Sequence, residues 1–136
     1  MGTTTKTGDV MERMILPALK HGGYTWQRHV RIGNRPCGKA HYVDAIATKD
    51  YLILLSSKWQ EVSGTAECKI PYEVICLIAA MADPKYSRCY LVLGGPGWTL
   101  REWYVSGGLT QFIRNTDKVN IITLEQFVAL ANQGKL

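Results

Sequence analysis

Residues 38–81 read GKAHYVDAIATKDYLILLSSKWQEVSGTAECKIPYEVICLIAAM, a pattern typical of two strands followed by a helix. The strands are expected at residues 41–48 and 52–60, joined by a short polar turn. The second strand begins as a continuous apolar run and ends in the polar sequence SSKWQ. Because successive side chains of a strand point to opposite faces, Ser56, Lys58 and Gln60 are expected to share one face.

The register of this hairpin decides whether an acid and a lysine meet at its end. With a three-residue turn, residues 49–51, Asp44 falls opposite Ser56, and Lys58 lies one step further along the same face. A two-residue turn would place Asp44 opposite Leu55, on the other face of the sheet. Burying charged side chains at the end of an apolar hairpin is unfavourable unless they are paired with opposite charges, so their presence there suggests a function.

A helix is expected over residues 66–82, where apolar side chains recur at helical spacing. If the helix is regular over these residues, Glu67 lies on its apolar face and Glu73 lies at the edge of that face. Glu67 is therefore expected to point at the sheet, near the end of the strand that carries Lys58. Pro71 leaves a second possibility open, because proline favours the first helical turn and would put Glu67 just before the helix.

The ends of the chain supply further elements. A helix over residues 10–21 is expected, capped by Asp9, and Glu12 stands at the capping-box position of this helix. Strands are expected at 88–93 and 119–123, and a closing helix at 124–132. Residues 94–97, GGPG, form a turn without the pattern of a phosphate-binding loop. Thr99 and Glu102 are expected to form a capping box that starts a short helix. The aromatic residues nearby are expected to be core rather than base-stacking groups, namely Trp98, Trp103 and Tyr104.

Length and composition favour one domain over residues 1–136 and an anionic partner. The chain carries 16 basic and 11 acidic residues, a net charge of +5 and a pI near 9.1. A further strand is expected at residues 24–32, with a turn at 33–38. The basic residues are densest in this strand and around its turn, where four of them stand close together: Arg28, Arg31, Arg35 and Lys39. This stretch is either a solvated hairpin face or a phosphate-contacting surface.

The sequence also bears on compartment. No apolar run reaches about 18 residues and no signal peptide opens the sequence, so no membrane association is expected. The four cysteines have no metal-site spacing and are expected to be free thiols in a reducing cytoplasm.

The order Asp44, hairpin, Ser56-x-Lys58 resembles the PD-(D/E)xK nuclease superfamily. Two longer runs, SSKWQEVSGTAECKIPYEV (residues 56–74) and YLVLGGPGWTLREWYVSGGL (residues 90–109), are similar to small bacterial and phage proteins of that superfamily, and through them to restriction, homing and junction-resolving endonucleases. The resemblance covers residues 9–132. It implies an α/β fold, namely a restriction-endonuclease-like α-β-β-β-α-β core with a mixed sheet flanked by helices.

The chain departs from the superfamily pattern at two positions. Val43 stands where proline precedes the first acid, and Ser56 stands where an aspartate or glutamate is usual. Some restriction enzymes of the superfamily supply the missing acid from the following helix. Glu67 is expected to replace it here, with Glu73 as the alternative.

The resemblance implies a Mg²⁺-dependent DNA endonuclease of restriction or homing type, with Mn²⁺ as a possible substitute. Asp44 and Glu67 would hold the metal ion, Lys58 would orient the attacking water, and Glu12 would be an outer or second-site partner. Ser56 and Gln60 would hydrogen-bond water on the metal.

The alternatives are a Holliday-junction resolvase and a catalytically inactive nucleic-acid-binding module of the same fold. Because one small domain offers one active site, cutting both strands would require a homodimer or homotetramer. The protein is expected to be intracellular and encoded by a bacterium or phage.

Overall fold

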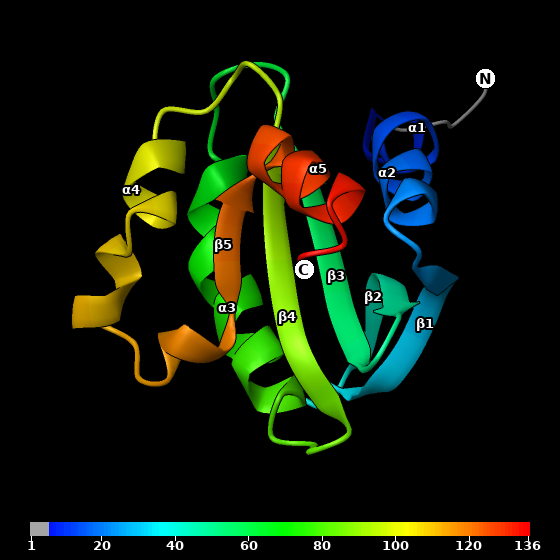
Figure 1. Cartoon of the computed structure of the whole chain (residues 1–136). Helices are drawn as coiled ribbons and strands as arrows, with labels where there is room; N and C mark the ends of the chain where they lie inside the picture. The colour runs from blue at the N-terminus through cyan, green and yellow to red at the C-terminus, as the bar shows by residue number, and fades with distance from the viewer. Residues whose placement is uncertain (1–5) are drawn as a thin grey trace.

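The computed structural model describes residues 6–136, which are arranged around a five-stranded sheet in the order β1-β2-β3-β4-β5 (Figure 1). The strands are β1 (Thr25–Asn34), β2 (Ala40–Thr48), β3 (Leu52–Trp59), β4 (Tyr86–Gly94) and β5 (Asn120–Thr123). The pairs β1–β2 and β2–β3 are antiparallel, whereas β3–β4 and β4–β5 are parallel. The expected α/β fold with a mixed sheet is confirmed.

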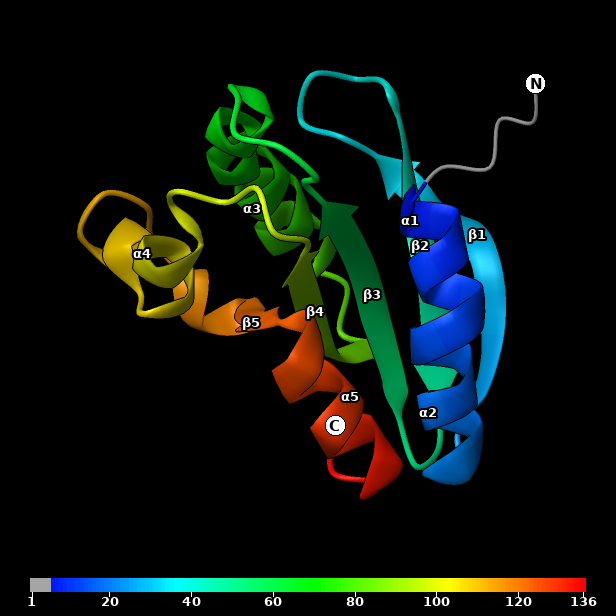
Figure 2. The ribbon, with the colours of Figure 1, turned by 90° about the horizontal axis from the view of Figure 1, so that it is seen from above.

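Helices cover both faces of the sheet (Figure 2). The first helical segment (α1, the π-helix η1 and α2) and α5 lie on one face, and α3 lies on the other (Figures 1 and 2). The helices are α1 (Lys6–Val10), η1 (Met11–Ile15), α2 (Leu16–His21), η2 (Ala66–Lys69, 3-10), α3 (Ile70–Ala80), α4 (Arg101–Val105), η3 (Gly108–Gln111, 3-10), η4 (Thr116–Lys118, 3-10) and α5 (Leu124–Asn132). None of the helices within residues 6–136 has the length and apolar character needed to cross a membrane.

Two apolar cores result, one on each side of the sheet. Leu55 of β3 packs in the core beneath α2 and α5, with Leu19 and Phe127. The neighbouring Leu54 packs in the opposite core, with Leu77 of α3. Strands buried on both faces read as continuous apolar runs, which explains why residues 52–55 do not alternate with polar residues.

The hairpin of β2 and β3 has the three-residue turn. Ala45 pairs with Leu55 and Thr48 pairs with Leu52, which leaves residues 49–51 as the turn. The same register continued by one step places Asp44 opposite Ser56, as the first of the two hairpin alternatives predicts. Asp44 therefore stands beside the polar end of β3.

The strand β1 has an unusual backbone beside the same residue. Val30 pairs with Val43, so His29 falls opposite Asp44, and His29 has a left-handed φ of 51°. Within β2, Ala45 packs in the core beneath α2 but Val43 packs in the core beneath α3. The two strands thus change the face that they present at the level of Asp44, where a non-glycine residue holds a conformation that L-residues rarely adopt.

Several local expectations are corrected. The N-terminal helix begins at Lys6, so Asp9 lies inside it and does not cap it. A 3-10 turn, η2, precedes α3, and Pro71 stands in the first turn of α3, as the second helix alternative predicts. Leu100, not Thr99, is the residue that caps α4. At α5 Thr123 forms a capping box with Gln126.

Candidate functional site

Asp44 is placed by the backbone of the neighbouring strand. The N–H of Ser57 donates to its Oδ2 at 2.6 Å, and the side chain is half-buried. Burial raises the pKa of Asp44, and this outweighs the opposite effects of the Ser57 N–H and of the charge of Lys58. Within residues 6–136 no basic side chain forms an ion pair with this carboxylate. The site therefore holds a partly buried acid whose charge is incompletely neutralised.

Lys58 contacts a second acid, which comes from the helix. Its Nζ lies 3.4 Å from Oε2 of Glu73, in the first turn of α3. Arg35 approaches Oε1 of the same carboxylate at 3.5 Å, and the fully buried His41 approaches it at 3.6 Å. Glu73 is itself only 8% exposed. Three basic groups from β2, β3 and the β1–β2 turn thus converge on one buried carboxylate.

The ionisation of Glu73 follows from these neighbours. Burial alone would raise its pKa, but the contact with His41 and the charges of Lys58 and Arg35 outweigh it and bring the pKa to about 2. The negative charge of Glu73 contributes in turn to the raised pKa of Asp44. The two carboxylates are therefore electrostatically coupled, and the charge of Lys58 lowers the pKa of both.

The carboxylate that contacts Lys58 is thus Glu73 and not Glu67, in contrast to the first expectation. Glu67 is 2% exposed and accepts hydrogen bonds from the Thr99 N–H, the Thr99 hydroxyl at 2.7 Å and the Leu100 N–H at 2.7 Å. These donors, first the Thr99 hydroxyl, lower the pKa of Glu67. The physical reason for the difference is the 3-10 turn before α3. Because Glu67 lies in this turn and not in the α-helix, the α-helical spacing does not fix its direction, and its side chain points to the loop that follows β4.

The glycine-rich turn after β4 packs on the chain that leaves β3. Gln60 donates through Nε2 to the Gly97 carbonyl at 3.0 Å and to Glu67 at 3.3 Å. Gly95 has a φ of 106°, and a Cβ there would lie 2.3 Å from the carbonyl oxygen of Gln60. A Cβ on Gly97 would come equally close, at 2.5 Å, to the backbone of Val62. The glycines therefore permit close backbone contact, and this contact is what holds Gln60 in place.

The remaining predicted residues are distributed around this centre. Ser56 is buried beside Asp44, and its place in the register is as expected. Glu12 pairs with Arg28 at 3.2 Å on the exposed surface of β1. Arg31 donates to Asn34 at 2.9 Å. Among the basic residues predicted to contact DNA, only Arg35 lies within ion-pair distance of Glu73.

A family description, the PD-(D/E)XK nuclease superfamily domain, matches residues 3–135, nearly the whole chain. The chain belongs to the PD-(D/E)XK nuclease superfamily. Nucleases of this superfamily typically use divalent metal ions, and their substrates are nucleic acids. No curated protein matches the chain.

The solved structures that match this superfamily member include one at low sequence identity. It is the crystal structure of a protein of unknown function, AF1548, with a TM-score of 0.49 and 8% sequence identity. The match covers 80% of this chain and 54% of the other, so the chain spans about half the length of that protein.

The acids of this PD-(D/E)XK domain fit a Mg²⁺ ion with few protein ligands. Within residues 6–136, no three His, Cys, Asp or Glu side chains are grouped so as to hold a metal ion between them. Mg²⁺ is commonly bound through one or two carboxylates, with water and phosphate oxygens completing its shell. Asp44 and Glu73 provide two coupled carboxylates, and Asp44 has no ion-pair partner among the described residues.

A cavity of about 370 Å³ opens beside Lys58 and Glu73. Its lining comes from the end of β3, the start of α3, the β1–β2 turn and the glycine-rich turn. The lining residues are Arg35, Lys58, Trp59, Gln60, Ala66, Lys69, Ile70, Tyr72, Glu73 and Trp98. The runs SSKWQ, GTAE and GGPGW, which are separated in the sequence, therefore surround one space.

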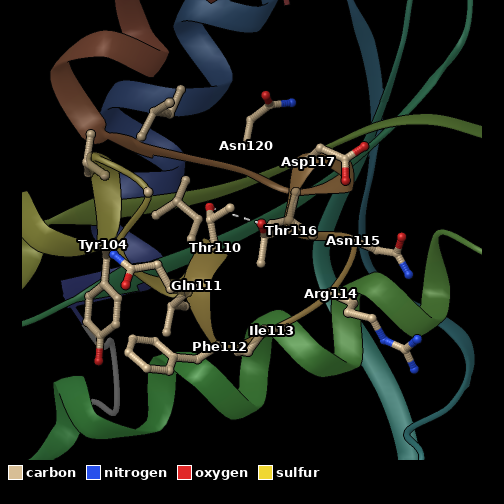
Figure 3. A pocket seen from close by; sticks show the side chains of 16 residues that line it. Tyr104, Thr110, Gln111, Phe112, Ile113, Arg114, Asn115, Thr116, Asp117 and Asn120 are labelled. Atoms are coloured by element: carbon tan, nitrogen blue, oxygen red, sulfur yellow. Dashed lines mark hydrogen bonds between the residues drawn. The ribbon is translucent and has the colours of Figure 1, made fainter.

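Figure 3 shows a second cavity, of about 660 Å³, near β5. It is lined by the end of α4, by η3 and η4, and by β5, and the Thr110 and Thr116 hydroxyls lie 3.2 Å apart within it. Asp44, Lys58 and Glu73 are not among its lining residues. The cavity beside Lys58 is therefore the one that belongs to the candidate site.

Sequence reasoning missed His41 and the full contribution of Arg35. A histidine at the start of a strand carries no sequence signal that it lies under a helix, and Arg35 was placed with the surface residues. Trp98, expected in the core, packs against the core beneath α3 and also lines the cavity. Trp103, also expected in the core, is 43% exposed, whereas Tyr104 is buried as expected.

Proposed function

We propose that this chain is a Mg²⁺-dependent DNA endonuclease that hydrolyses phosphodiester bonds, with Asp44 and Glu73 as metal-holding carboxylates and Lys58 as the catalytic cation. The observation that carries the proposal is the contact of Lys58 with Glu73 at 3.4 Å beside the hairpin acid Asp44. An acid from α3 thereby takes the place left open by Ser56. Mn²⁺ is expected to substitute for Mg²⁺.

Each residue has a separate part in this proposal. A bound Mg²⁺ supplies a water of lowered pKa and offsets negative charge on the phosphate. Asp44 is held in position by the Ser57 N–H, and its partly buried carboxylate gains a cation that neutralises it. Glu73 is ionised near neutral pH because its pKa is about 2.

Lys58 is suited to act on the substrate. Its side chain is 43% exposed, whereas the carboxylate that it contacts is 10% exposed. The ammonium group therefore stands between a buried acid and the solvent from which a phosphate arrives. From there it stabilises the charge that develops on the phosphate oxygens and orients the attacking water.

The other predicted residues support this centre. Gln60 and Ser56 stay candidates for hydrogen bonds to water at the metal site. The Glu67 carboxylate accepts hydrogen bonds from Thr99 and Leu100 in the loop after β4, and it also accepts one from Nε2 of Gln60. Its contribution is therefore to position Gln60.

DNA is the substrate that the charge distribution favours. The net charge is +5, and Arg28, Arg31 and Lys39 are exposed along β1 and the turn that follows it. Contacts of such residues with phosphates would position a strand across the β1–β2 hairpin, next to Asp44. Restriction or homing cleavage of both strands would need two copies of the domain, as a homodimer or homotetramer.

Two alternatives have specific support. A junction resolvase would read the shape of DNA through phosphate contacts, and the basic hairpin suits that reading. An inactive nucleic-acid-binding module is favoured by the ion pairs that Lys58 and Arg35 already form with Glu73. The same experiment separates these alternatives from the endonuclease.

The test is incubation of the purified chain with supercoiled plasmid and with a four-way junction, each with Mg²⁺ and with EDTA. We expect Mg²⁺-dependent cleavage that Asp44→Asn and Lys58→Ala reduce by at least about a hundredfold, the usual scale for loss of a group that stabilises the transition state. Lys85→Ala removes an exposed lysine on the surface and serves as the matched control. Binding without cleavage of either substrate would favour the inactive module, and cleavage of the junction alone would favour the resolvase.

A further inference from the structure

We propose that the cavity beside Lys58 and Glu73 receives one unstacked nucleobase of the DNA strand, so that the preferred substrate carries an unpaired base next to the cleaved phosphodiester. The inference rests on the proposed function, because it names the class of DNA that this site would take. The cavity volume, about 370 Å³, lies within the range of about 300–1,000 Å³ typical of small-ligand sites.

Two aromatic side chains in the cavity wall have their polar atoms fixed. The Trp98 indole donates to the Gly94 carbonyl at 2.7 Å, and the Tyr72 hydroxyl donates to the Cys37 sulfur at 3.1 Å. Because each ring is tethered, it loses little conformational freedom when a base stacks on it. Aromatic rings bind bases of any sequence by stacking, which suits a pocket for an extruded or single-stranded base.

The cavity adjoins the residues that are proposed to cleave the phosphodiester bond. Lys58 and Glu73 belong both to its lining and to the proposed catalytic centre. A base held in the cavity therefore carries its own phosphate towards Lys58. Lys69 and Arg35 add positive charge to the same wall, which favours a phosphate-linked ligand over a neutral apolar one.

Gln60 is a lining residue that carries a buried hydrogen-bond acceptor without a partner among the described residues. Both partners of its Nε2, the Gly97 carbonyl and the Glu67 carboxylate, are acceptors, and they fix the orientation of the amide. Its Oε1 is buried and has no hydrogen-bond partner in the described part of the chain. A buried acceptor without a partner is unfavourable until a donor reaches it, and the ring N–H and amino groups of nucleobases are such donors.

The test compares three versions of one short duplex labelled with a fluorophore: fully paired, with a single bulged base, and with that base replaced by an abasic nucleotide. Affinity is measured by fluorescence anisotropy in EDTA, so that no cleavage occurs. We expect the bulged duplex to bind at least about fivefold more tightly than the other two, which is the lower end of the range for stacking one base on an aromatic ring. The abasic duplex has the same backbone and separates base binding from recognition of a bend.

Protein variants locate the base. Tyr72→Ala should abolish the preference for the bulged duplex and leave affinity for the paired duplex within about twofold, because Tyr72 is 46% exposed and its loss leaves the core intact. Tyr72→Phe keeps the ring and should keep the preference, as should Trp103→Ala, which removes an exposed tryptophan that does not line this cavity. Trp98→Ala, checked for folding by circular dichroism, should act as Tyr72→Ala does.

Two results would overturn the inference: equal affinity for the three duplexes, or a preference for the bulged base that Tyr72→Ala leaves unchanged. The same duplexes incubated with Mg²⁺ report on cleavage separately. Equal affinities together with Mg²⁺-dependent cleavage would refute the base pocket and leave the endonuclease standing. A preference that depends on Tyr72 without any cleavage would support the base pocket and refute the endonuclease.

Discussion

Replacing Glu73 with glutamine removes the charge around which Lys58, Arg35 and His41 are arranged, and its effect on stability can be worked from the structure. The pKa of this acid falls from an ordinary 4.5 to about 2 in the folded chain. At about 1.4 kcal/mol per pKa unit, the folded state gains roughly 3 kcal/mol from ionised Glu73. Glutamine keeps the shape of the side chain and loses this contribution.

The sign follows from the direction of the pKa change. Because the folded pKa lies below the unfolded one, the stabilisation is complete above about pH 4.5 and is lost as the pH falls through about 2. Urea unfolding of the wild type and of Glu73→Gln should therefore differ by about 3 kcal/mol at pH 7 and by about 1 kcal/mol at pH 3. Comparing the two proteins at each pH cancels the titration of the acids that do not interact with Glu73.

Glu125→Gln is the control for this prediction, because Glu125 is an exposed acid at the start of α5. Its cost should stay within about 0.5 kcal/mol at both pH values. A gap between wild type and Glu73→Gln that is the same at pH 7 and pH 3 would refute the electrostatic account. So would a gap at pH 7 no larger than that of the control.

Three further predictions concern the loop, the metal and a helix cap. Gly95→Ala should lower the free energy of unfolding by about 1–3 kcal/mol more than Gly33→Ala does. Both glycines have a positive φ, but only at Gly95 would a Cβ lie against the Gln60 carbonyl. Equal losses of stability in the two variants would argue against close packing of the loop. Mg²⁺ at ten times its dissociation constant should stabilise the wild type by roughly 1.4 kcal/mol, which is measured as a higher melting temperature. The stability of Asp44→Asn should increase much less under the same conditions. An equal increase in the two proteins would show that Asp44 does not hold the metal ion. Thr123→Ala should cost about 1 kcal/mol in urea unfolding through loss of the capping box of α5, and no change would show that this cap is not needed.

The arrangement of the hairpin was predictable because it follows from local rules. The apolar run over residues 52–55 predicted a buried strand, and the three-residue turn that places Asp44 opposite Ser56 was one of two alternatives. The continuous apolar character of β3 and β4 follows from helices on both faces of the sheet. The hairpin end and its two charged residues could therefore be predicted from the sequence, apart from the choice of turn.

The choice between Glu67 and Glu73 was not predictable in the same way. A 3-10 turn and an α-helix rotate successive side chains by different amounts, so a phase extrapolated across residues 66–70 fails for Glu67. The Thr99 and Leu100 N–H groups that donate to Glu67 lie in the loop after β4, more than thirty residues further along the chain. Such contacts depend on tertiary packing, which has no periodic signal in the sequence.

The burial of His41 beside Glu73 shows the same limit. Its position at the start of β2 predicts only that it alternates with its neighbours, and the face that it takes depends on the change of face at the level of Asp44. That change coincides with the left-handed φ of His29, a conformation with no reliable sequence signature in a residue other than glycine.

The most direct measurement of the central claim is the rate at which Glu73→Gln and Glu125→Gln convert supercoiled plasmid to nicked or linear DNA with saturating Mg²⁺. If an acid from α3 completes the site with Asp44 and Lys58, Glu125→Gln cleaves at the wild-type rate and Glu73→Gln is slower by at least about a hundredfold. Equal rates for the two variants, with an active wild type, would contradict the assignment of Glu73 as the second metal-holding acid.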